Sequence, residues 1–131
     1  MKYLTNYIED AQTRCFNKAG AFFAFSNRQF DEAKKEGVEY FNMGAGLICP
    51  KVSADSLLRN LKSINKKGIK QDIKENGIKA IIHRELANHE CQITMNITDC
   101  VNKLVDYPIT REDIQAEWDE YFHECIENDR F

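Results

Sequence analysis

Short apolar segments broken by glycine interrupt an otherwise helical hydrophobic pattern between residues 20 and 50, and this interruption decides the class of fold. Residues 21–25 read Ala-Phe-Phe-Ala-Phe, which is too short for a helix and rich in aromatic side chains, so we predict a buried strand there. Residues 38–43 and 47–49 are apolar extended segments on either side of Gly44-Ala45-Gly46, as in a β-hairpin. Because two or three short strands are marginal on their own, helices must pack against them.

The rest of the chain spaces its apolar residues three and four apart, as amphipathic helices do. A helix over residues 3–18 would stop at Gly20, and another would begin at an N-cap Ser53 and stop at Gly68. Thr110 is the predicted N-cap of the last helix. Other helices are predicted at residues 26–35, 69–76, 78–89 and 98–105. We therefore expect an α+β fold, with five or six helices packed on a small two- or three-stranded antiparallel sheet, in a single domain of residues 1–131.

Residues 91–97 fit two structures. Cys91, Ile93, Met95 and Ile97 alternate with polar residues, which is the period of a strand. We favour a fraying helix end and a connector, with Thr98 capping the following helix.

Composition and cysteine usage indicate a soluble protein of a reducing compartment. The chain has no run of about 18 apolar residues and its first residues lack the apolar stretch of a secretion signal, so we expect a cytoplasmic protein without a membrane segment. None of the five cysteines forms a C-x-x-C pair, which removes support for a zinc ribbon or a thioredoxin-like site. Cys49 precedes Pro50 and Lys51 and could be a nucleophile, but a buried strand cysteine is the commoner case.

Charge is distributed unevenly along the chain. The net charge of −3 argues against general nucleic-acid binding. Residues 51–79 nevertheless carry eight Lys/Arg against three acids, and residues 110–131 carry eight acids against two arginines. The two segments could be solvated helix faces, pair within the fold, pair between subunits in a homo-oligomer, or each face a partner.

The densest group of titratable side chains lies between His83 and Cys91. Its histidines are six residues apart, about 120° round a helix, so they cannot chelate one metal ion as in H-E-x-x-H. Glu85 and His89 face each other at a spacing of four, and His83 and Glu90 share a second face. Each pair could be a proton-transfer couple, although an intrahelical structural pair is commoner. We expect no metal ion and no cofactor.

Two further motifs have ordinary structural explanations. Gly44-Ala45-Gly46 lacks the third glycine and the following helix of a dinucleotide-binding turn, so we predict a plain hairpin turn. The aromatic residues 22, 23, 25, 30, 40 and 41 could stack bases, but only Arg28 lies near them in sequence. We predict that these aromatic side chains pack in the core.

Three segments carry a resemblance to a known family. They are Gly20–Ser26 with Gln29-Phe30, Met43–Lys51 and Ile82–Glu90. In these segments the chain resembles a family of small uncharacterised proteins encoded by tailed phages, including the crAss-like phages of gut bacteria. The resemblance covers most of the chain and implies phage origin and expression in a bacterial cytoplasm. It implies no activity and no catalytic residue.

Three functional hypotheses follow. The first, which we favour, is a non-enzymatic phage accessory protein that binds a host or phage protein in the host bacterial cytoplasm, in counter-defence or host takeover. The second is a small hydrolase, possibly metal-dependent, and the third is a binder of a small nucleotide signal that uses residues 59–79 and the Gly44–Gly46 turn. The candidate contact residues of the first are Glu117, Glu120, Glu124, Arg59, Lys62 and Lys66, and the candidate catalytic residues of the second are His83, Glu85, His89 and Glu90.

Overall fold

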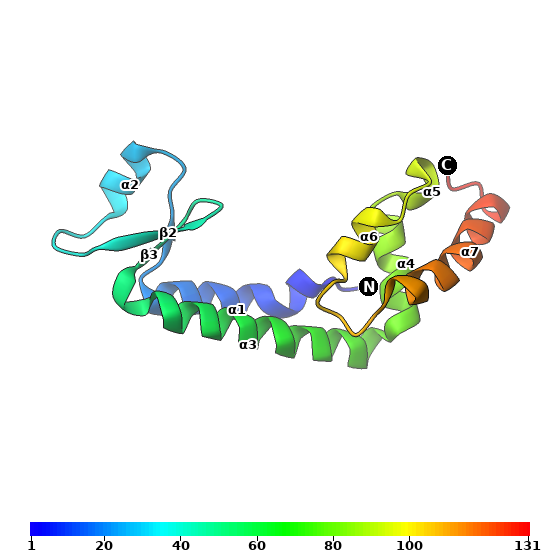
Figure 1. The fold of residues 1–131 in the computed structure, drawn as a ribbon, viewed down its shortest axis with the longest axis horizontal. Coiled ribbons are helices and arrows are strands. Elements are labelled where there is room, and N and C mark those ends of the chain that lie inside the picture. The colour runs from blue at the N-terminus through cyan, green and yellow to red at the C-terminus, as the bar shows by residue number, and fades with distance from the viewer. The chain divides into compact units, whose positions relative to one another are not determined.

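A computed structural model describes all 131 residues as seven helices and three strands (Figure 1), which confirms the α+β class. Contacts divide the chain into two compact units, an N-terminal unit of residues 2–68 and a C-terminal unit of residues 69–131. The long helix α3 (Lys51–Asn76) contributes to both. None of the helices combines the length and the apolar character needed to cross a membrane.

The N-terminal unit contains the predicted hairpin. Strands β2 (Tyr40–Gly44) and β3 (Leu47–Pro50) pair antiparallel, and β1 (Phe22–Phe23) pairs antiparallel with the other edge of β3, so the sheet order is β1-β3-β2. β1 is shorter than the predicted strand of residues 21–25 because the chain soon enters helix α2 (Asn27–Ala33). Of the two candidate caps, Ser26 and Asn27, it is Ser26 that caps α2: its hydroxyl accepts a hydrogen bond from the Gln29 N–H.

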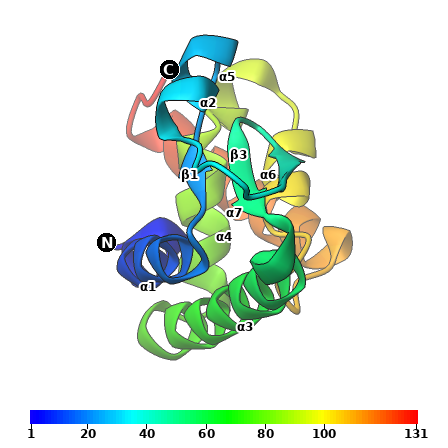
Figure 2. The same cartoon turned by 90° about the vertical axis from the view of Figure 1, so that its left-hand side faces the viewer.

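Helices pack against both faces of the sheet. On one face the rings of Phe22, Phe30 and Tyr40 contact one another with centroids 5.5–6.2 Å apart, which attaches α2 to the sheet. On the other face buried Cys49 packs with Ala54 and Leu57 of α3. Helix α1 (Leu4–Ala19) completes this core and lies beside α3 in Figure 2. The partly buried residues around this core are Cys15, Phe16, Ala19, Ala21, Met43, Leu47 and Leu61.

Two predicted ends of α3 are wrong. The helix begins at Lys51, directly after β3, and Ser53 is not its N-cap: the Ser53 hydroxyl donates instead to the carbonyl oxygen of Ala19 at 2.6 Å. Gly68 does not end the helix, which continues to Asn76. A Cβ atom at Gly68 would lie 2.2 Å from Cγ2 of Ile8 on α1. Gly68 is therefore a point of close helix contact rather than a helix stop.

The C-terminal unit is helical and is centred on α4 (Ile78–Asn88), which contacts α5 (Cys91–Thr94), α6 (Thr98–Lys103) and α7 (Arg111–Glu127). Residues 91–94 are helical, as we favoured. Thr98 is not the N-cap of α6 but its first residue, and its N–H donates to Oδ1 of Asn96. Thr110 does cap α7, in a capping box with Asp113. The most buried apolar residues of the unit are Ile81, Ile82, Leu86, Cys91, Cys100, Leu104, Ile114 and Cys125.

We expect Gly68→Ala to destabilise the protein, although alanine is the better helix former by about 1 kcal/mol. The added methyl group would overlap Ile8, and overpacking of this kind costs about 1–3 kcal/mol. Chemical unfolding followed by circular dichroism measures the effect, with the exposed neighbour substitution Lys67→Ala as the control. In an Ile8→Ala background the penalty should disappear. A Gly68→Ala protein at least as stable as the wild type would contradict the close contact.

Candidate functional site

The four predicted catalytic residues, His83, Glu85, His89 and Glu90, do not form one site, because they point to different neighbours. His83 pairs with α7, where its Nε2 lies 2.8 Å from Oε2 of Glu117. Glu85 is buried, and its Oε2 lies 3.5 Å from Nε2 of His89. Glu90 is exposed at the start of α5, in the left-handed backbone region. The structure therefore brings Glu85 and His89 together, as their spacing predicts, and gives His83 a partner other than Glu90.

His83, Glu117 and Glu120 form what we call the His83 cluster. One ligand atom from each, the His83 ring nitrogen and a carboxylate oxygen of either glutamate, lie within 4.8 Å of one another. The His83 ring stands edge-on against Tyr121 with centroids 5.7 Å apart. Beside it Lys79 Nζ lies 2.9 Å from Oε1 of Glu120. This hydrogen bond lowers the pKa of Glu120 and raises the pKa of Lys79, so that both remain charged near neutral pH.

A second set of charged residues is buried beneath α4. Arg84 makes two parallel hydrogen bonds to the Asp72 carboxylate, of 2.9 and 3.0 Å, and Asp72 is fully buried. The Tyr107 hydroxyl and the Asn76 amide also donate to Asp72. Burial acts to raise the pKa of Asp72, but the hydrogen bonds outweigh it and hold that pKa below its usual value. Burial and the bond to Asp72 raise the pKa of Tyr107, which stays a neutral donor.

Glu85 connects this buried network to His89. Nε of Arg84 donates to Oε1 of Glu85 at 2.9 Å. The other oxygen, Oε2, faces Nε2 of His89, and both atoms are buried without a hydrogen bond. The structure thus places the predicted Glu85–His89 couple at the edge of the buried Arg84–Asp72 network.

Asp72, Arg84 and Tyr107 were not among the residues predicted from the sequence. A signal was present in the helical spacing, because Asp72 follows Ile69 by three residues on an apolar stripe. Glu85 likewise follows Ile82 by three residues. Charged residues at such positions are buried with a partner, but spacing does not identify that partner.

The predicted contact residues are divided between the units. Arg59, Lys62 and Lys66 are exposed on α3 in the N-terminal unit, whereas Glu117 and Glu120 already pair with His83 and Lys79. The N-terminal unit carries eleven Lys/Arg and seven acids, a net charge of +4. The C-terminal unit carries seven Lys/Arg and fourteen acids, a net charge of −7. The unit boundary falls within the basic segment 51–79, and the acidic segment 110–131 lies wholly in the C-terminal unit.

Three of the phenylalanines predicted to be in the core are on the surface. Phe23, Phe25 and Phe41 are 52%, 74% and 47% exposed, whereas Phe22, Phe30 and Tyr40 are partly buried as expected. Phe23 and Phe25 stack with their centroids 6.3 Å apart. Phe41 pairs with Cys49 in the sheet, and the ammonium group of Lys51 lies over its ring. We call Phe23, Phe25 and Phe41 the aromatic edge.

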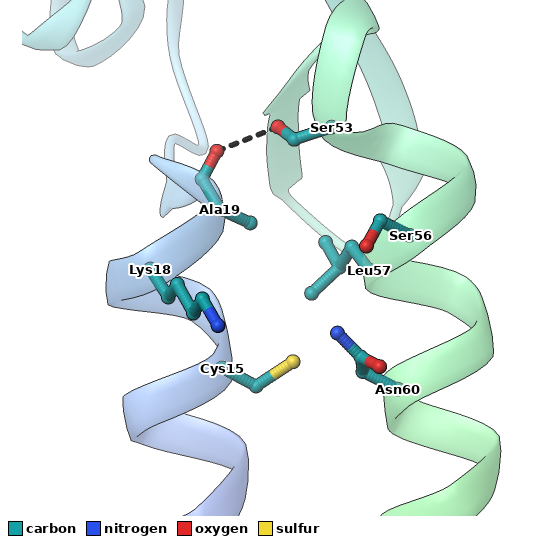
Figure 3. Close-up of a pocket in the computed structure, with 7 residues that line it drawn as sticks. All are labelled: Cys15, Lys18, Ala19, Ser53, Ser56, Leu57 and Asn60. Carbon is teal, nitrogen blue, oxygen red and sulfur yellow. Dashed lines mark hydrogen bonds between the residues drawn. The ribbon is translucent and has the colours of Figure 1, made fainter.

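The cavity between two helices of the N-terminal unit is too small for a nucleotide, although more open hollows of about 460 and 670 Å³ lie elsewhere in the unit. This cavity of about 140 Å³ lies between α1 and α3 and is lined by Cys15, Lys18, Ser56 and Asn60 (Figure 3), and it is smaller than the pockets that hold ligands of nucleotide size. At the Gly44–Gly46 turn, a Cβ atom on Gly46 would lie 2.3 Å from the Phe25 ring. The Phe25 ring thus packs against Gly46, and both residues line an open hollow of about 460 Å³ beside the turn.

We expect Asp72→Asn to lower the free energy of unfolding by about 3 kcal/mol near neutral pH, because it leaves the buried guanidinium of Arg84 without its main counter-charge. Since folding lowers the pKa of Asp72, its stabilisation is complete above about pH 4 and is lost as the pH falls further. In urea unfolding, the difference in unfolding free energy between wild type and Asp72→Asn should be smaller at pH 3 than at pH 6. The exposed substitution Glu75→Gln is the control. A difference in unfolding free energy that does not depend on pH would contradict the buried ion pair.

Thiol labelling tests the burial of the cysteines. Cys15 is partly exposed, whereas Cys49, Cys91, Cys100 and Cys125 are buried and none is in a disulfide. Burial, followed by the nearby Cys91 and Glu85, raises the pKa of Cys100 to about 12, which also suppresses its reactivity. A maleimide should therefore modify the native protein once, at Cys15, and the unfolded protein five times, as counted by intact mass. Rapid native labelling of Cys49 would show that it is not the buried strand cysteine of this structure.

Comparisons with known proteins identify the family but not an activity. No curated protein and no solved structure matches the chain. A model of a family of unknown function, DUF7659, matches residues 4–124, which include most of both units and every residue of the His83 cluster and the aromatic edge. The chain belongs to this family of unknown function, DUF7659.

Proposed function

We propose that this protein is encoded by a tailed phage and acts in the bacterial cytoplasm as a binding protein, which captures a host or phage protein in counter-defence or host takeover. The observation that carries the proposal is the aromatic edge of the N-terminal unit, where three phenylalanine rings are about half exposed or more.

The aromatic edge has the chemistry of a protein contact. Phe23 and Phe41 lie on one face of the sheet, because their pairing partners Leu47 and Cys49 are two residues apart on β3 and side chains two apart share a face. Stacking of Phe25 on Phe23 extends the apolar surface beyond the end of β1. Aromatic side chains lose little conformational entropy on binding and are enriched at the centres of interfaces. Phe23 and Phe25, which are exposed and already contact one another, are therefore favourable anchor residues.

The charge of the N-terminal unit indicates which kind of partner would bind. The unit carries a net charge of +4, and Arg59, Lys62 and Lys66 recur on one face of α3 at spacings of three and four. Complementary charge speeds association and fixes orientation. We propose an acidic protein surface as the partner.

The acidic helix α7 is a less favourable contact surface for a partner than the aromatic edge of the N-terminal unit. Glu117 and Glu120 are held by His83 and Lys79 within the unit. Reversing their charge would disturb the C-terminal unit itself and would not report on a partner alone. We therefore place the contact on the aromatic edge and on Arg59, Lys62 and Lys66.

Site-specific photo-crosslinking tests this assignment. A photoreactive phenylalanine analogue at Phe25, in protein produced in infected cells, should give one discrete adduct that survives nuclease treatment and contains an acidic protein. The same analogue at Val105, which is 75% exposed in the C-terminal unit, is the matched control and should give none. The charge reversals Arg59→Glu, Lys62→Glu and Lys66→Glu together should abolish the Phe25 adduct.

Three outcomes would contradict the proposal. They are equal crosslinking from Phe25 and Val105, an adduct that nuclease removes, and an adduct unchanged by the triple charge reversal. An adduct of twice the mass of the chain would replace an outside partner with a second copy of this protein.

A further inference from the structure

We propose that the His83 cluster binds one divalent transition-metal ion of the zinc type, with Nε2 of His83 and one carboxylate oxygen each from Glu117 and Glu120 as ligands. These atoms lie within 4.8 Å of one another. Bonds of about 2.1 Å to one tetrahedral ion would place them about 3.4 Å apart, so small side-chain rotations close the site. The inference is independent of the proposed function.

The ligands stand on helices that are fixed by packing. Glu117 and Glu120 are three residues apart on α7 and share a face, and His83 reaches them from α4, which packs against α7. The His83 ring is held edge-on by Tyr121, whose hydroxyl donates to Oε1 of Gln92. A ligand set oriented in this way before binding loses little entropy when the ion arrives.

The local charge matches a divalent cation. Glu117, Glu120 and Glu124 lie around Lys79, and Glu124 lines the same surface hollow as His83 and Glu120. Three carboxylates and one ammonium group leave two negative charges here, which one divalent ion would neutralise. Metal binding would break the ion pair between Lys79 and Glu120. The free-energy cost is small, because both side chains are about half exposed.

The donor set selects the class of metal. An imidazole nitrogen with two carboxylates suits zinc and similar first-row ions, whereas magnesium and calcium prefer oxygen ligands alone. Three protein ligands leave room for water on the ion, as in catalytic rather than structural zinc sites. Neither the cysteine spacing nor the two histidines of one helix indicates this site, because its carboxylates come from a helix 34 and 37 residues further along the chain.

Calorimetric titration of the full chain with Zn²⁺ and Mg²⁺ tests the site, in a Cys15→Ser background that removes the partly exposed thiol. We expect one equivalent of Zn²⁺ to bind and Mg²⁺ to bind at least about 10-fold more weakly. His83→Gln and Glu117→Gln should each weaken Zn²⁺ binding by at least about 10-fold. The matched control is His123→Gln, because His123 pairs with Glu127 in the same way on an exposed face of α7 but has no third ligand.

The variant Lys79→Met should change the Zn²⁺ affinity in the opposite direction from the ligand variants. It keeps the test decisive if a ligand variant unfolds. Removing the ammonium that competes for Glu120 should strengthen Zn²⁺ binding several-fold, and no purely structural role of the cluster predicts such a gain. Absence of saturable binding, unchanged affinity in His83→Gln and Glu117→Gln, or an equal loss in His123→Gln would overturn the proposal. Unchanged or weakened binding in Lys79→Met would also overturn it.

Discussion

The buried ion pair between Arg84 and Asp72 determines how the C-terminal unit is organised. A guanidinium that is only 3% exposed is strongly unfavourable without a counter-charge, so α4 must turn Arg84 toward the end of α3, where Asp72 lies. Once that rotation is fixed, Glu85 points into the interior and His83 points to α7. The spacing along α4 sets the angle between His83 and the Glu85–His89 pair, and the Arg84–Asp72 pair fixes which neighbour each of them faces.

The two units differ in the way they are stabilised and in what they present to solvent. The N-terminal unit has a small sheet between α2 and a helix pair, carries net positive charge and exposes three phenylalanine rings. The C-terminal unit is helical and acidic and contains two sets of titratable residues, one buried and one at the surface. We accordingly assign partner binding to the first unit and metal binding to the second.

Sequence predicted the features that depend on neighbouring residues. The hairpin at Gly44–Gly46, the end of α1 at Gly20 and the capping box at Thr110 all follow from local backbone chemistry, and all are present. The predicted helix end at Gly68 is wrong, because a glycine that permits close helix contact looks the same in sequence as one that ends a helix. The pairs His83–Glu117 and Arg84–Asp72 join different helices, and helical spacing alone does not specify which helix faces which.

A double-mutant cycle on Asp72→Asn and Arg84→Gln tests most directly whether this buried pair organises the C-terminal unit. Equilibrium unfolding of the wild type, both single variants and the double variant at neutral pH gives the coupling energy. The account predicts about 2–3 kcal/mol, as for residues in direct contact within one buried network. A coupling below about 0.5 kcal/mol, the value typical of solvent-exposed ion pairs, would contradict it.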